Sequence, residues 1–233
     1  MTEPRTDRQA AVIGATGGIG RALFRALDAS GAYQTVTAFS RQGDPGLDLA
    51  DEASIETAAA SLKDGPPLRL VIDATGLLHG DGVQPEKTWR ALDAAALAHQ
   101  FQVNAIGPAL LMKHMLPLLP RAGRSVFATL SARVSSIGDN AVGGWYGYRA
   151  SKAALNQFVR TAAIELRRTR QDAICVALHP GTVATALSQP FAKTGLDVRT
   201  PSVAADDFLA VIAKLTPEDS GGFFDQRGDV IPW

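Results

Sequence analysis

The chain has 233 residues, of which 46% are hydrophobic, and a formal net charge of +0 at pH 7. This length suits one α/β domain with a sizeable core, and we expect it to span residues 1–233. The charges are evenly mixed and form no basic block, so nothing indicates a polyanionic partner and we expect no binding to nucleic acid. The polar start and the short apolar stretches predict neither a signal peptide nor a membrane span, so we expect a cytoplasmic protein.

A glycine-rich turn follows the first apolar run. Residues 10–13 predict a strand, and a helical pattern follows that ends at Gly31. Between them the sequence reads Gly14-x-x-x-Gly18-x-Gly20. Glycines let a phosphate approach the main chain, and the helix behind them offers free N–H groups at its positive end. The turn therefore predicts a nucleotide-binding site.

The end of the second predicted strand, residues 35–40, bears on the choice of cofactor. In dinucleotide-binding folds an acidic residue at this place holds the ribose hydroxyls, whereas an arginine suits a 2′-phosphate. Here the strand ends in Ser40-Arg41 and carries no acid. We therefore expect NADP rather than NAD, with a solvated surface arginine as the alternative interpretation.

The rest of the chain alternates between apolar runs and helical patterns. Strands are expected at 68–74, 125–131 and 173–179 and near Phe223, and helices at about 53–63, 93–118, around Tyr148 and at about 202–214. Apolar runs without alternation, separated by helices, predict a parallel sheet covered on both faces. Residues 77–92 are expected to form a loop and residues 182–200 a lid. The single cysteine, Cys175, lies in a strand and is expected in the core.

Pro108 interrupts the long helical pattern of residues 93–118. Proline has no N–H, so the carbonyl of Asn104, four residues earlier, loses its helical partner. That carbonyl can hold a water close to the Asn104 side chain. The alternative is a kinked helix with no role beyond packing.

Tyr148 and Lys152 lie four residues apart in the stretch GWYGYRASKAALN. On a helix this spacing puts both side chains on one face, one turn apart. The ammonium is expected to lower the pKa of the phenol, because a nearby positive charge favours phenolate. Tyr148 would then exchange a proton near neutral pH as a general acid or base.

The order of these motifs resembles that of the short-chain dehydrogenase/reductase family over essentially the whole chain. The family's motifs match this sequence at the glycine turn (Gly14, Gly18, Gly20), the helix asparagine (Asn104 in FQVNAIGP), the Tyr-x-x-x-Lys pair (Tyr148, Lys152), and Pro180-Gly181 with Val183 and Thr185. The stretches SARVSSIGDNAVGGWYGYRASKAALN and GGFFDQRGDVIPW look closest to the C-factor-like subgroup.

This resemblance implies a single-domain, Rossmann-type doubly wound parallel sheet of about seven strands, with the cofactor across the carboxyl ends of the strands. It implies hydride transfer between NADP(H) and a small-molecule carbonyl or alcohol, and we expect no metal. Tyr148 would protonate the carbonyl oxygen during reduction, Lys152 would lower its pKa and hold the nicotinamide ribose, and Asn104 would anchor the water of a proton relay. The implied cofactor contacts are Gly14, Thr16, Gly18, Ile19, Gly20, Ser40, Arg41, Asp48, Leu49, Ala74, Thr75, Gly76, Tyr148, Lys152, Pro180, Gly181, Val183 and Thr185.

Three positions depart from the family's pattern. Ile13 stands where threonine is usual, and Asp73-Ala74-Thr75-Gly76 replaces Asn-Asn-Ala-Gly. The Ser-Ser pair that carries the catalytic serine reads Ser131-Ala132. The strand end favours Ser131 as the replacement and the family's spacing before the tyrosine favours Ser135, with Ser136 as a third candidate. We interpret Ser131 as the catalytic serine, which requires the strand to end there, because adjacent strand residues point to opposite faces.

The resemblance leaves a second function open, that of an NADP(H)-binding signalling or regulatory protein with little turnover. It also implies a homodimer or homotetramer that pairs the helices carrying Tyr148 and Asn104. Candidates for that surface, unless they face the sheet, are Met112, Met115 and Phe158. The sequence does not name the substrate. Its pocket is expected among residues 77–92, 139–145 and 186–200, with Trp145 and Phe191 as candidate apolar walls.

Overall fold

The computed structural model describes residues 7–80, 82–191 and 198–233. Within these ranges six parallel strands form one sheet in the order β2-β1-β3-β4-β5-β8. They are β1 (Gln9–Ile13), β2 (Thr35–Phe39), β3 (Leu68–Asp73), β4 (Ser125–Leu130), β5 (Ala173–Leu178) and β8 (Phe223–Phe224). The strand order reverses between β1 and β3, which is the switch point of a doubly wound sheet. The predicted fold class is therefore confirmed.

The sheet has one strand fewer than the roughly seven that the family resemblance implies. Residues 40–51 after β2 form turns and add no strand to the edge. Two further strands, β6 (Thr182–Val183) and β7 (Val198–Arg199), pair with each other outside the main sheet.

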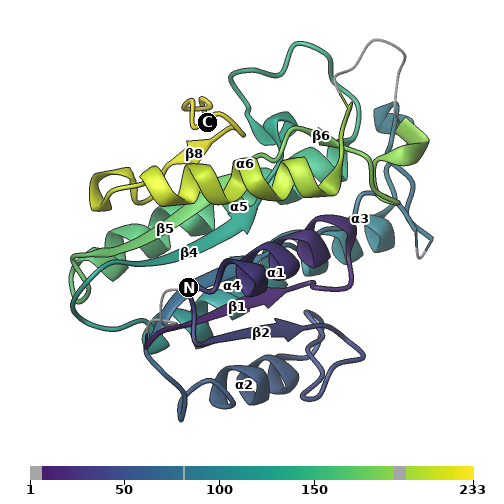
Figure 1. Ribbon diagram of the computed structural model, residues 1–233. Helices are drawn as coiled ribbons and strands as arrows, with labels where there is room; N and C mark the ends of the chain where they lie inside the picture. The colour runs from purple at the N-terminus through teal and green to yellow at the C-terminus, as the bar shows by residue number, and fades with distance from the viewer. Residues whose placement is uncertain (1–6, 81, 192–197) are drawn as a thin grey trace.

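Helices cover both faces of the sheet (Figure 1). On one face α1 (Gly18–Ser30) packs beside α6 (Pro201–Lys214). The other face carries α2 (Glu52–Ala60), α4 (Gly107–Met115) and α5 (Tyr146–Arg167). None of the helices in the described ranges combines the length and apolar character needed to cross a membrane.

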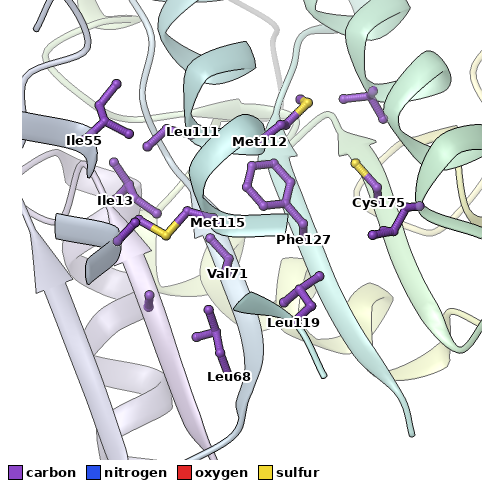
Figure 2. Packing of buried hydrophobic residues seen from close by; sticks show 14 of the residues in the cluster. Ile13, Ile55, Leu68, Val71, Leu111, Met112, Met115, Leu119, Phe127 and Cys175 are labelled. Carbon is purple, nitrogen blue, oxygen red and sulfur yellow. The ribbon is translucent and has the colours of Figure 1, made fainter. Parts of the chain in front are cut away.

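Alternate residues along a strand pack against the helices on opposite faces of the sheet. In β1, Ala10 and Val12 join the cluster under α1 and α6, whereas Ala11 and Ile13 join the opposite cluster. Figure 2 shows the second cluster, in which Phe127 and Val71 of the sheet pack against Leu111 and Met115 of α4. Because both faces are buried, the strands read as unbroken apolar runs. Cys175 is fully buried in β5, as expected.

Two candidates for an oligomer surface belong to this core instead. Met112 and Met115 are 4% and 0% exposed, because the apolar face of α4 packs on the sheet. Phe158 of α5 is 42% exposed, and Ile164, further along the same helix, is 51% exposed. The apolar surface of this layer therefore comes from α5.

The long helix predicted at 93–118 is divided at its centre. α3 (Ala94–Phe101) runs into a π-helical turn (Gln102–Ile106), which leads into α4 with Pro108 near its start. The wider turn is closed by a hydrogen bond from Gly107 N to Gln102 O. It turns the Asn104 side chain into the interior, where the residue is 0% exposed. Such turns occur often at functional sites.

Candidate active site

The glycine turn joins β1 to the start of α1. Gly17 is the N-cap of α1 and brings no capping side chain, and the first turn of the helix carries no acidic residue. The N–H groups and the positive end of the helix dipole therefore remain available to an anion. Gly20 is needed for a different reason, since a Cβ there would lie 2.2 Å from Gly14 O. Gly17 is absent from the predicted cofactor contacts, because the family's glycine motif does not include that position. Its place just before the helix could have indicated an N-cap.

Three adjoining cavities run along the carboxyl ends of the strands. We name them after one residue each: the Arg41 cavity of about 400 Å³, the Lys152 cavity of about 250 Å³ and the Trp145 cavity of about 310 Å³. The first two share Gly17 and the segment Ala74–Gly76, and the last two share Ser131 and Tyr148. The three cavities thus form one groove. A hollow of about 630 Å³ between α4 and α5 is larger, but it lies away from these residues.

The groove collects nearly all of the predicted cofactor contacts. The Arg41 cavity is lined by Gly14, Thr16, Ser40, Arg41, Asp48, Leu49, Ala74, Thr75 and Gly76. The Lys152 cavity adds Gly18, Ile19, Tyr148, Lys152, Pro180 and Thr185, and the Trp145 cavity adds Gly181 and Val183. Gly20 lines none of the three cavities, because it packs beneath Gly14. The lining also includes His99 and Val103, which no motif had indicated.

Tyr148 and Lys152 lie one turn apart near the start of α5 and are 8% and 2% exposed. Lys152 Nζ donates to the carbonyls of Leu130 (2.8 Å) and Thr75 (3.4 Å). Burial raises the pKa of Tyr148 to about 12 and lowers the pKa of Lys152 to about 8, although the charge of Asp73 opposes the second shift. The expected lowering of the Tyr148 pKa is therefore wrong for this structure, because burial favours the neutral form of both groups.

Asn104 links the π-helical turn to the loop after β3. Its Oδ1 accepts from Leu77 N (2.7 Å), and its Nδ2 donates to Leu77 O (2.7 Å) and Ser151 Oγ (3.1 Å). The side chain thus fixes the start of the 77–92 loop against α5. Its predicted role as the anchor of a water stays a prediction.

Asp73 holds the turn that separates the Arg41 and Lys152 cavities. Its carboxylate accepts from Thr75 N (3.0 Å), Thr75 Oγ1 (2.6 Å) and Thr129 Oγ1 (2.6 Å). This contribution was missed, because Asp73 was noted only as a departure from the family's pattern. Its place at the end of a buried strand, two residues before a threonine, is typical of a side chain that closes a turn.

The three candidate serines occupy different surroundings. Ser131 Oγ donates to Asn156 Oδ1 (2.7 Å), and Asn156 Nδ2 donates to Ser135 Oγ (2.8 Å). Ser131 lines the two cavities that contain Tyr148, whereas Ser135 lines a separate hollow beside Trp233. Ser136 Oγ accepts from Asp139 N (3.1 Å). β4 ends at Leu130, so the required end of the strand is present, and the position of Ser131 favours it among the three.

The wall of the Trp145 cavity begins with an uncommon backbone turn. Gly143, Gly144 and Trp145 have φ of 70°, 68° and 54°, and among the described residues Trp145 is the only non-glycine with positive φ. A left-handed tryptophan costs about 1–2 kcal/mol. Its ring meets the rings of Tyr148 (6.2 Å between centroids) and Phe191 (5.3 Å) edge to face. Trp145 and Phe191 thus line the cavity as expected. The predicted lid of 182–200 includes residues 192–197, which lie outside the described residues.

The sheet, the glycine turn and the groove define a dinucleotide-binding α/β protein of the Rossmann type. Residues 8–195 match the short chain dehydrogenase family, and the chain belongs to that family.

Two curated relatives extend this comparison. The 1-hydroxy-2-glutathionyl-2-methyl-3-butene dehydrogenase of Rhodococcus sp. (strain AD45) is 34% identical over 217 residues, which are 92% of this chain and 88% of that protein. The C-signal protein of Myxococcus xanthus is 39% identical over 149 residues, which are 62% of this chain and 85% of that protein. The second similarity agrees with the expected likeness to the C-factor-like subgroup.

Solved structures agree with the family assignment. An NADPH-bound carbonyl reductase from chicken fatty liver superposes with a TM-score of 0.85 and 27% identity, covering 98% of this chain and 100% of that chain. A carbonyl reductase from Pseudomonas aeruginosa PAO1 superposes with a TM-score of 0.78 and 26% identity, covering 97% of this chain and 100% of that chain.

Proposed function

We propose that this protein is an NADP(H)-dependent oxidoreductase that transfers hydride between the cofactor and a carbonyl or alcohol, with Tyr148 as general acid and base. The observation that carries the proposal is the position of Tyr148 and Lys152. They lie one turn apart on α5, in the same cavity as the uncapped start of α1. The NADPH bound to the similar chicken carbonyl reductase supports the choice of cofactor.

The residues present fit such a cofactor. The N-terminus of α1 suits its pyrophosphate, because unpaired N–H groups and the helix dipole attract anions. Ser40 and Arg41 line the far end of the Arg41 cavity, where an arginine suits a 2′-phosphate. Lys152 and Thr185 line the other end, next to Tyr148. When bound there, the cofactor supplies or accepts the hydride.

The protonation state of Tyr148 suits reduction. With a pKa of about 12 the phenol keeps its proton at neutral pH and can donate it to a carbonyl oxygen. Lys152, with a pKa of about 8, exchanges protons close to neutral pH and can restore the proton through a relay. Oxidation of an alcohol would use the same groups in reverse and requires Tyr148 to lose its proton.

Ser131 supplies the second hydrogen bond to the carbonyl oxygen in this proposal. Its hydroxyl must turn away from Asn156 Oδ1 to do so, which would leave that oxygen without a donor. The Ser135 hydroxyl accepts from Asn156 Nδ2 and lies 3.4 Å from Ser131 Oγ, so it can donate to Ser131 Oγ once that hydroxyl turns toward the substrate. Ser131 would then keep a hydrogen-bond partner on the protein side through Ser135.

A second function is an NADP(H)-binding signalling protein with little turnover. The 39% identity to C-signal favours it, and so does the alanine at position 132. The retained Tyr148–Lys152 pair and the Ser131 hydroxyl favour the enzyme.

A screen of NADPH oxidation over aldehydes, ketones and quinones separates the two functions. The enzyme predicts turnover of at least one compound and its loss in Tyr148→Phe. Tight NADPH binding without turnover of any compound would favour the signalling protein.

We further propose that the chain forms a homodimer or homotetramer through α4 and α5. The exposed Phe158 borders the hollow of about 630 Å³ between these helices. Burying such apolar surface in a second copy is favourable. Light scattering at micromolar concentration should give at least twice the monomer mass of 24.5 kDa, and a monomer would contradict the proposal.

A further inference from the structure

The left-handed turn Gly143–Trp145 is held by two residues from different elements. The Arg149 guanidinium donates to the carbonyls of Val134 (2.9 Å), Gly144 (2.9 Å) and Gly143 (3.1 Å). Glu86 comes from the 77–92 loop. Its carbonyl accepts from Trp145 N (2.5 Å), and its carboxylate Oε2 accepts from Gly147 N (3.2 Å). Glu86 thus binds the last residue before α5 and the second residue within it.

Glu86 is only 5% exposed, which is unusual for a carboxylate. A buried charge requires compensation, and the start of α5 supplies it through free N–H groups and the positive end of the helix dipole. The helix needs this partner, because its own N-cap, Trp145, contributes no side-chain hydrogen bond. A residue about 60 positions earlier in the chain therefore caps α5.

Gly147 shows how closely this cap is fitted. A Cβ there would lie 2.3 Å from Gln100 Oε1 and 2.9 Å from Glu86 Oε1. Within the described parts of the chain, Glu86 Oε1 and both polar atoms of the fully buried Gln100 side chain have no hydrogen-bond partner. Buried polar atoms without partners destabilise a protein. These atoms and the strained turn lie together around Gly147.

The consequence of this cap lies in the Trp145 cavity. The Trp145 backbone is fixed by Glu86, and its ring lies against Tyr148 and Phe191. The remaining apolar lining includes Leu78 and Leu187. Tyr148 also contacts this wall, but it lies on α5, which is held in addition by its packing on the sheet through Leu155 and Val159. Moving the cap should therefore displace the wall of the cavity more than the proton donor.

We propose that Glu86 is a positioning residue that sets the place of the Trp145 ring. We propose further that the cavity selects carbonyl compounds carrying a flat ring, because Trp145 and Phe191 place aromatic rings in its wall beside Tyr148. The proposal rests on the proposed function, because it names the substrate class of the same site. Glu86 touches neither the reacting atoms nor the substrate.

The first test compares two aldehydes that differ in a ring, benzaldehyde and propanal. Glu86→Ala should lower kcat/KM for benzaldehyde at least tenfold, mainly by raising KM, and lower that for propanal less than threefold. Glu86→Gln should restore most of the loss, since its amide oxygen can accept from Gly147 N. Glu56→Gln, the same change at an exposed position of α2, is the matched control and should have no effect. An equal loss for both aldehydes, or no loss, overturns the proposal.

The second test places Glu86→Ala on a Trp145→Ala background. Glu86 acts through the Trp145 ring in this proposal. When that ring is absent, Glu86→Ala should therefore no longer change the ratio of benzaldehyde to propanal turnover. A further change in that ratio overturns the proposal. If Glu86→Ala does not fold, Glu86→Asp keeps the charge but shortens its reach, and should shift the ratio in the same direction.

The third test does not depend on turnover. Phenylalanine in place of Trp89 and Trp233 leaves Trp145 as the single tryptophan of the three. In this background Glu86→Ala should shift the fluorescence emission to longer wavelength and increase quenching by acrylamide, whereas Glu56→Gln should not. An unchanged spectrum overturns the proposal. If no aldehyde, ketone or quinone of the screen is turned over but the spectrum shifts, the proposed function fails while the positioning role of Glu86 stands.

Discussion

The two ends of the groove are built in different ways. The Arg41 and Lys152 cavities lie where strands end and helices begin, so the register of the sheet fixes residues such as Gly17 and Thr75. The Trp145 cavity is lined mostly by irregular segments, which are held by hydrogen bonds between distant parts of the chain. Asn104 binds Leu77, which precedes Leu78 in the wall of this cavity, and Glu86 binds Trp145. The first end is inherited with the fold, whereas the second can vary without disturbing it.

The largest expected effect tests the chemistry that both ends share. Tyr148→Phe removes the proton donor and should lower turnover by about 10²–10⁴-fold, while NADPH binding stays within about twofold. Tyr146→Phe, the same change at the first residue of α5, should leave both unchanged. Steady-state kinetics and a binding titration provide the measurement. Full activity in Tyr148→Phe would remove the basis of the mechanism.

The next effect concerns the serine between the two ends. Ser131→Ala should lower the single-turnover rate by about 10²–10³-fold, as the loss of one donor to the carbonyl oxygen does in other enzymes. Ser135→Ala should cost far less, because Ser135 contacts the site only through Asn156 and Ser131. NADPH binding is the control for folding. A large loss in Ser135→Ala alone would make Ser135 the donor to the carbonyl oxygen. No loss in either variant would show that the site works without a serine.

A smaller effect is expected for stability at the substrate end. Burial, with Arg133 and Arg199 adding to it and Asp225 opposing it, lowers the pKa of His179 from 6.5 to about 4. As the pH falls from 6.5 toward 4, His179 therefore takes up a proton in the unfolded chain before it does so in the folded one. The free energy of unfolding should fall by about 2 kcal/mol between pH 7 and pH 5. Urea unfolding at pH 7 and pH 5 measures this loss. His179→Asn should remove most of it, and an unchanged difference would contradict the pKa shift.

The smallest effect tests the cofactor end. NADPH should bind at least tenfold more tightly than NADH, a difference of about 1.4 kcal/mol, because Arg41 can pair with a 2′-phosphate. Arg41→Asp should reverse the preference. Arg121→Asp, at an exposed position ahead of β4, is the matched control and should leave the ratio unchanged. Equal affinities for NADPH and NADH in the unaltered protein would mean that Arg41 is a solvated surface residue with no part in cofactor choice.

The same contrast explains what could be predicted from the sequence. The strands, the helices and the lining of the Arg41 and Lys152 cavities follow local patterns, such as the glycine turn and the spacing of Tyr148 and Lys152. Glu86, Gln100 and Asn156 leave no local signal, because their roles depend on partners far away in the chain. The pKa of Tyr148 was misjudged for a related reason, since the spacing to Lys152 is visible in the sequence but burial is not.

The hydrogen bonds of Arg149 connect the proton donor to the cavity wall. Arg149 adjoins Tyr148 on α5 and holds three carbonyls of the connection that carries Trp145. The proton donor and the cavity wall therefore depend on the same first turns of one helix. Segments linked in this way open as a unit, at a lower free energy than global unfolding. On heating, catalysis should be lost before the helical circular dichroism signal falls, in a single step that also quickens amide hydrogen exchange over residues 143–150.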